Sequence, residues 1–182
     1  MDFDDDEPDE VVIPKELKFA TPTGSVVWDA TKPESGYLKM NTRMTRGVWG
    51  LVAGRKFEVD GVTFDVQKVD RNYATMLATS LDNQPIEESK RLLVLASSGA
   101  ENTAMKWNED RTSVGKEWGK GPTLVNVVTG SVGLPLKSAT VYALDGTGKR
   151  VSEVATTKPS AGTILFQIGP EHKTIWYEVV VK

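Results

Sequence analysis

The stretch Val62-Thr-Phe-Asp-Val-Gln67 alternates apolar and polar residues without a break, and it directly follows Asp60-Gly61. A period of two places Val62, Phe64 and Val66 on one face of a β-strand. Asp-Gly between two alternating runs is a two-residue hairpin signal, because both turn positions need a positive φ. The stretch therefore predicts one strand of an antiparallel hairpin with its apolar face in a core.

The same period continues in both directions along the chain. Thr163-Ile-Leu-Phe-Gln-Ile168 repeats the pattern, with Ile164, Phe166 and Ile168 directed inward. Residues 174–181 are β-branched and aromatic, which is typical of a central strand. Residues 85–95 are interpreted as a short turn that leads into a strand. Strands are expected at residues 25–30, 36–41, 47–52, 56–59, 62–67, 73–80, 91–96, 103–107, 124–128, 139–144, 163–168 and 174–181.

Turn sequences separate these runs at intervals of about 8–12 residues, which is typical of sandwiches and barrels. The predicted fold class is all-β: an antiparallel β-sandwich, jelly-roll or immunoglobulin-like. Residues 1–10 are predicted to be a disordered acidic tail or linker, and residues 11–182 the sandwich domain. A break at residues 119–122 leaves open a second, smaller hairpin-rich β lobe at the C-terminus.

Charge and composition exclude several classes of function. The ten N-terminal residues hold seven of the 25 acidic residues, so 22 basic residues face 18 acidic ones in the rest of the chain. This basic excess is spread out, and we therefore expect no nucleic-acid partner. No apolar run approaches the roughly 20 residues that span a bilayer, so no membrane partner is expected. The acidic N-terminus is the reverse of a signal peptide, so an exported protein would be represented here by its mature form or by a piece.

Catalytic and metal-binding patterns are missing from the sequence. His172 is the only histidine and is expected to be a solvated loop residue, which leaves no catalytic triad. There is no cysteine, so zinc has no suitable ligand set. No cofactor is predicted. Calcium alone stays open, because carboxylates such as the alternating Asp2, Asp4 and Asp6 can bind it. The sequence predicts no catalytic residue and no resident metal.

Five Trp and four Tyr are the most informative residues. Aromatic rings can stack on the apolar faces of sugar rings, but a single Trp more often fills a core. Trp28 alternates with Val26 and is expected in the core. Trp176 and Tyr177 must point to opposite faces of one strand. Trp49 lies among glycines, and its exposure stays open.

Residues 102–118 place two tryptophans in a long polar stretch. We predict a sugar-contacting surface there, formed by Trp107, Trp118, Asn102, Asn108, Asp110 and Arg111, with Trp49 as a further candidate. The alternative is a long loop closed over one end of the sandwich by its two aromatic residues. In that alternative, Asp110 and Arg111 tie the backbone together.

Several segments also resemble a known group of domains. They are Thr23-Gly-Ser-Val-Val-Trp-Asp29, Thr79-Ser-Leu-Asp-Asn-Gln-Pro-Ile86, Ser89-Lys-Arg-Leu-Leu93, Glu101-Asn-Thr-Ala-Met-Lys-Trp107, Trp118-Gly-Lys-Gly-Pro-Thr-Leu-Val125 and Tyr142-Ala-Leu-Asp-Gly146. This set resembles the C-terminal β-sandwich accessory domains that follow catalytic (β/α)-barrels in large bacterial glycoside hydrolases. The resemblance runs from about residue 23 to residue 181 and implies a secreted parent enzyme that degrades polysaccharides.

Three functions follow as expectations. The first is a non-catalytic carbohydrate-binding module whose partner is a plant or algal polysaccharide or an oligosaccharide. The second is a structural accessory domain that packs on the parent catalytic barrel and binds no sugar. An exposed apolar patch would favour this second function. The third, a stand-alone glycoside hydrolase, has the least support.

Overall fold

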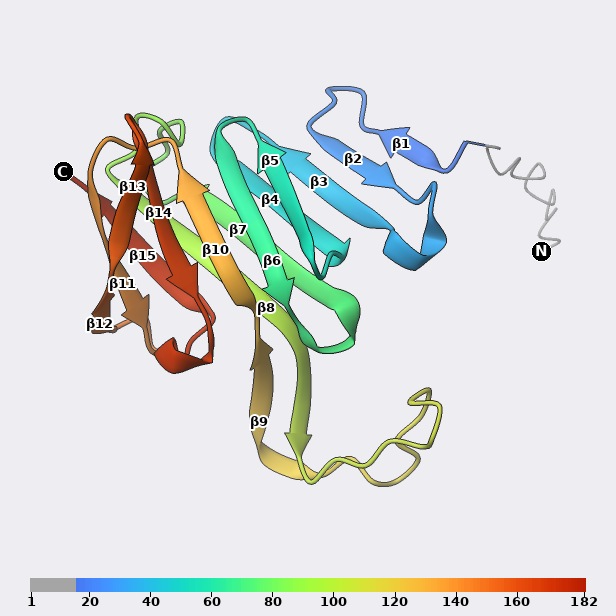
Figure 1. The fold of residues 1–182 in the computed structure, drawn as a ribbon. Helices are drawn as coiled ribbons and strands as arrows, with labels where there is room; N and C mark the ends of the chain where they lie inside the picture. The colour runs from blue at the N-terminus through green and yellow to red at the C-terminus, as the bar shows by residue number, and fades with distance from the viewer. Residues whose placement is uncertain (1–15) are drawn as a thin grey trace, which may run out of the picture.

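The structure is a computed structural model that describes residues 16–182. The tail predicted at residues 1–10 lies outside the described residues, as do Asp2, Asp4 and Asp6. Two antiparallel sheets pack face to face, which confirms the predicted all-β sandwich (Figure 1). Short 3-10 helices lie at Pro33–Ser35 (η1), Asp70–Asn72 (η2) and Pro170–His172 (η3).

The larger sheet, sheet A, has ten strands in the order β1-β2-β3-β4-β7-β8-β15-β11-β12, with β9 paired to β8. Its strands are β1 (Lys18–Ala20), β2 (Val26–Asp29), β3 (Tyr37–Asn41), β4 (Thr45–Leu51), β7 (Tyr73–Ser80), β8 (Arg91–Thr103), β9 (Lys120–Val127), β11 (Ala139–Leu144), β12 (Arg150–Val154) and β15 (Trp176–Val181). As expected for a central strand, β15 lies between β8 and β11.

Sheet B has five strands in the order β13-β14-β10-β6-β5. They are β5 (Arg55–Val59), β6 (Val62–Lys68), β10 (Thr129–Leu134), β13 (Thr156–Ser160) and β14 (Thr163–Ile168). The hairpin at Asp60-Gly61 is confirmed, because β5 and β6 pair on either side of it and both turn residues have positive φ, 47° and 80°. Both sheets contain strands from before and after residues 119–122.

The core lies between the sheets and contains the residues that the alternation predicted. Val62, Phe64, Val66, Ile164, Phe166 and Ile168 are all buried. Tyr177 enters the same core from β15, and the N–H of Gly169 donates a hydrogen bond to its Oη at 3.4 Å. Burial raises the pKa of the Tyr177 hydroxyl to about 12, because the charged phenolate would lose its hydration.

One expected strand is wrong, and the structure has four strands that the sequence did not predict, β1, β10, β12 and β13. Residues 103–107 do not form a strand, because β8 ends at Thr103 and Ala104 takes a positive φ of 60°. β10 occupies the centre of sheet B, but its glycines hide the alternation that would have predicted it. A Cβ on Gly130 would lie 2.0 Å from the carbonyl oxygen of Asp65, so the backbones of β10 and β6 require glycine there.

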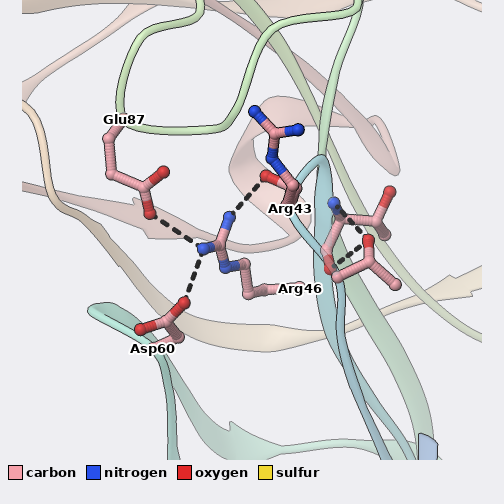
Figure 2. A network of polar contacts seen from close by, with 6 residues as sticks. Arg43, Arg46, Asp60 and Glu87 are labelled. Carbon is pink, nitrogen blue, oxygen red and sulfur yellow. Dashed lines mark hydrogen bonds and ion pairs between the residues drawn. The ribbon is translucent and has the colours of Figure 1, made fainter. Parts of the chain in front are cut away.

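A buried arginine links the two sheets at one end of the sandwich. Arg46 lies on β4, and its Nη2 donates to Asp60 Oδ2 at 2.6 Å and to Glu87 Oε1 at 2.8 Å (Figure 2). Its Nη1 donates to the backbone carbonyl of Arg43 at 2.9 Å. The Arg46 side chain is only 4% exposed. One guanidinium therefore joins the β3–β4 turn, the β5–β6 turn and the β7–β8 connection.

Candidate functional site

The residues predicted to contact sugar lie mostly on an arm that leaves the sandwich. β8 is long, and its second half pairs with β9 rather than with β15. In Figure 1 this two-stranded arm runs beyond the edge of both sheets and ends in a long loop. The first five residues of β9, from Lys120 to Leu124, are all exposed, as is Val125 after them. The predicted surface is therefore carried away from the core and is not a lid over one end of the sandwich.

Trp107 is half-buried within the arm loop and is covered by two arginines. The guanidinium carbon of Arg111 lies 5.3 Å from the centre of the indole ring, and that of Arg71 lies 6.0 Å from it. Both arginines also form ion pairs with Glu101, that of Arg111 at 2.5 Å. The Trp107 Nε1 is shielded from solvent and has no hydrogen-bond partner among the described residues. Cation–π contacts thus occupy the ring that sugar stacking would need.

The two predicted amides hold the loop together. Asn108 Oδ1 accepts hydrogen bonds from the N–H groups of Thr112 and Ser113, at 2.8 and 3.0 Å. Asn102 Nδ2 donates to the carbonyl oxygen of Trp118 at 3.0 Å, and its Oδ1 accepts a bond from Thr123. Because these contacts fold the loop and fix its base, the amide groups are largely engaged within the chain.

Trp118 and Asp110 remain open to solvent. Trp118 is 63% exposed, the most of any tryptophan among the described residues, and Asp110 is exposed as well. The loop surrounds a hollow of about 490 Å³, whose lining includes Trp107, Asn108 and Val114 but not Trp118. The structure thus places the two tryptophans in one loop without directing both of them into one hollow.

Trp49 lies apart from the arm, on the outer face of sheet A. The strand register aligns it in a row across four strands, in which Phe19 is opposite Trp28, Trp28 opposite Leu38 and Leu38 opposite Trp49. Side chains that are directly opposite in an antiparallel pair share one face and touch. Trp28 is exposed and the other three are half-buried. We call these four residues the apolar row.

A second row runs parallel to the apolar row on the same face. It contains Val26, Met40, Gly47, Leu77, Leu95 and Trp176, each opposite the next. The outer face of sheet B differs, because Lys56, Glu58 and Gln67 are exposed there. An antiparallel sandwich normally turns polar side chains to water. Sheet B follows this rule, and sheet A departs from it.

The expectation that Trp28 fills the core is wrong. Its side chain is 47% exposed and stacks on Phe19, with ring centroids 5.4 Å apart. Val26 and Trp28 do share a face, as their alternation predicted, but that face is the outer one. Trp176 and Tyr177 point to opposite faces as expected, with Tyr177 in the core. Alternation identifies which residues share a face, and it cannot tell inside from outside where both faces are apolar.

Glu178 is a buried carboxylate on the same outer face. Its side chain is 3% exposed and forms ion pairs with Arg150, at 2.5 Å, and with Arg91. The guanidinium carbon of Arg150 also lies 4.3 Å from the ring centre of Tyr142. The hydrogen bond from Arg150 is the largest cause that holds the pKa of Glu178 below its ordinary value of 4.5. Glu178 is therefore a structural anion paired with two arginines of its own chain.

His172 is more enclosed than the sequence suggests. Its side chain is 17% exposed, and its ring meets the Tyr177 ring edge-on, with centroids 5.7 Å apart. Its Nε2 lies 3.4 Å from Glu171 Oε1. The expectation of a solvated histidine is therefore wrong, because η3 folds it against the end of the core. Within residues 16–182, no cluster of three or more His, Asp or Glu side chains could hold a metal ion.

Comparisons with known proteins add no relative. No family model, no curated protein and no solved structure matches the chain. In the part of the chain that the structure describes, no helix has the length and apolar character needed to cross a bilayer.

Proposed function

We propose that this chain is a non-catalytic accessory domain that packs against a second folded domain through the outer face of sheet A. The apolar row carries this proposal. Phe19, Trp28, Leu38 and Trp49 are aligned side by side across β1 to β4, and none of the four is fully buried. Covering such a surface contributes about 2.5 kcal/mol for each 100 Å² of apolar area removed from water.

The chemistry of this face favours a protein partner over a polysaccharide. Leu38 lies between Trp28 and Trp49, and Val26, Met40 and Leu77 form the neighbouring row, so aliphatic side chains flank the rings. Extended apolar faces of this kind are typical of interfaces between proteins or domains. The partner that the sequence resemblance implies is a glycoside hydrolase catalytic barrel, in an exported enzyme.

Association with a catalytic barrel of the glycoside hydrolase class that the resemblance implies tests the proposal. Isothermal titration should detect binding of the unaltered chain, and the double substitution Trp28→Ser, Trp49→Ser should weaken it by about 100-fold, or 2.7 kcal/mol. Val151→Ser is the matched control, because Val151 is 65% exposed on β12, which lies at the opposite edge of sheet A from β1. An unaltered chain that does not associate would refute the proposal.

Polysaccharide binding is the second candidate function, and the exposure of Trp118 favours it. The Trp118 ring is 63% exposed and offers a stacking surface, and the exposed carboxylate of Asp110 lies in the same loop. Affinity gel electrophoresis in plant and algal polysaccharides tests this function. Retardation of the unaltered chain supports it, and migration unchanged in every gel, with folded protein, excludes it.

A further inference from the structure

Two hollows meet at Trp176, on the outer face of sheet A near the base of the arm. The larger has a volume of about 380 Å³ and lies between β9 and the start of β15, where Leu124, Val125 and Lys173 line it. The smaller, of about 230 Å³, lies beside the β11–β12 turn, where Leu93, Leu144 and Asp145 line it. Trp176 and Gly146 line both hollows. We call the two hollows together the Trp176 cleft.

The backbone that carries Trp176 is fixed in the sheet at the centre of this cleft. Trp176 is opposite Leu95 in the register of β15 and β8, and its neighbour Tyr177 is anchored in the core. The backbone N–H of Trp176 donates a hydrogen bond to Thr174 Oγ1 at 3.0 Å. The indole is half-buried, so part of the ring stays open to a ligand. A side chain on a strand that is already ordered loses less entropy on binding than one on a chain segment that must first become ordered.

Polar groups stand at the rim of the cleft. Asp145 Oδ1 accepts hydrogen bonds from the N–H and the hydroxyl of Thr147, at 2.8 and 2.7 Å, and from the N–H of Lys149. These hydrogen bonds lower the pKa of Asp145, and the bond from the Thr147 hydroxyl has the largest effect. The carboxylate is therefore charged at neutral pH and can accept further hydrogen bonds. At the other hollow, exposed Lys173 supplies an ammonium donor, and the hydroxyl oxygen of Thr123 can accept a hydrogen bond.

The cleft combines an aromatic ring and aliphatic walls with one carboxylate, one ammonium group and one hydroxyl at its rim. This combination suits a ligand ring that has an apolar face and a polar edge. A pyranose has this character. A phosphate or another strong anion fits less well, because the Asp145 carboxylate would repel it. We propose that the Trp176 cleft binds an oligosaccharide made of pyranose units, one of which stacks on Trp176. The proposal rests on the carbohydrate-binding candidate and is independent of domain docking.

The cleft and the apolar row are separate surfaces. Three strand intervals separate β4, which carries Trp49, from β15 in sheet A, a distance of about 14 Å at the usual strand spacing. A domain whose contacts end at β4 would therefore leave the Trp176 cleft accessible.

Gly146 provides a substitution that fills the cleft without disturbing the fold. A Cβ at this position would meet no atom within 4 Å, and its φ is not in the left-handed region. Gly146→Leu should therefore fold normally and occupy the space that both hollows share. Ala161→Leu, at an exposed position before β14 in sheet B, is the matched control.

The experiment is affinity gel electrophoresis in hydroxyethylcellulose, xylan, laminarin and galactomannan. We expect the unaltered chain to be retarded by at least one of these, and Gly146→Leu and Trp176→Ala to weaken that binding by about tenfold or more. Ala161→Leu and Trp118→Ala should bind as the unaltered chain does. Thermal unfolding of each variant separates loss of binding from loss of fold.

Each other outcome has a definite meaning. If the unaltered chain binds and only Trp118→Ala abolishes binding, the cleft is the wrong site and the carbohydrate-binding function stands. If Gly146→Leu and Trp176→Ala both bind normally, the proposal that the Trp176 cleft is the binding site is also overturned. If none of the four polysaccharides retards the unaltered chain, the saccharide proposal fails together with the carbohydrate-binding candidate, while domain docking is unaffected.

Discussion

The phenyl ring of Phe19 stacks on the indole of Trp28, with centroids 5.4 Å apart and planes inclined by 30°. The pair joins β1 to β2 on a part of sheet A where no residue of either strand is fully buried. Because β1 has only three residues, this contact is a large share of what attaches it to the sheet.

The first prediction concerns this pair. Phe19→Ala and Trp28→Ala should each lower the free energy of unfolding by about 0.5–1.5 kcal/mol, since both rings lose the same stacking contact. A double-mutant cycle measured by urea unfolding should give a coupling energy of at least about 0.5 kcal/mol. If the losses of unfolding free energy in the two single variants add up to the loss in the double variant, the two rings do not stabilise each other.

Arg46 should be far more sensitive than its neighbour Arg43. Arg46→Ala removes hydrogen bonds to two carboxylates and one carbonyl, and we expect it to cost about 2–4 kcal/mol of unfolding free energy. Arg43 contributes only its backbone carbonyl to this network, so Arg43→Ala should change stability by less than about 0.5 kcal/mol. Equal effects of the two substitutions in chemical denaturation would contradict the linking role of Arg46.

Gly130 should tolerate no side chain. Gly130→Ala would bring a Cβ to 2.0 Å from the Asp65 carbonyl, so β10 and β6 would have to separate, at a cost of about 1–3 kcal/mol or more. Gly146→Ala, where a Cβ meets open space, serves as the comparison and should be nearly neutral. Thermal melting of both variants measures the difference, and similar melting temperatures would count against the tight β10–β6 contact.

Acid should destabilise the protein in part through Glu178. Its pKa in the folded state is lowered from 4.5, so the folded state binds fewer protons than the unfolded state in this range. The resulting stability is fully present above about pH 5 and is lost as the pH falls through the folded-state pKa. Glu178→Gln should be less stable than the unaltered chain at neutral pH, and this difference should shrink in urea unfolding near pH 3. A constant difference across this range would contradict the linkage.

Alkali should act through Tyr177 with the opposite sign. Its pKa is raised from 10.0 to about 12, so the folded state keeps the proton that the unfolded state releases. This contribution is fully present below pH 10 and is lost as the pH rises through about 12. Ultraviolet titration of the phenol groups should show one tyrosine that ionises late, and Tyr177→Phe should remove that step. Four tyrosines that all ionise near pH 10 would contradict it.

Much of the fold could be predicted because the alternation is strong where sheet B meets sheet A. Val62, Phe64 and Val66 have polar neighbours on both sides, so their inward direction is unambiguous. β10 escaped prediction because close backbone packing requires glycine at Gly130, and glycine carries no hydrophobic signal. β13 contains Lys158 and Pro159, which suit an edge strand and resemble a loop in sequence.

The candidate surfaces were harder to predict than the fold. A polar stretch around Trp107 suggested exposure, but distant Arg71 lies over the ring, and single-sequence patterns do not reveal such contacts. The alternation of Val26 with Trp28 favours an inward face, and only the strand register shows that this part of sheet A is also apolar on its outer side. Trp176 gave the correct alternation with Tyr177, while its cleft depends on β9 and the β11–β12 turn, both remote in sequence.

The position of β15 has a consequence for how the protein folds. Sheet A is continuous only because β15 pairs with β8 on one side and with β11 on the other. The strands that end at β8 and the pair β11–β12 are thus joined by a strand that follows all of them in the chain. The closing of this gap requires contacts between residues far apart in sequence, which typically slows folding to milliseconds or longer. Until β15 docks, the facing edges of β8 and β11 are free to pair with other chains, and this interval is when aggregation is most to be expected.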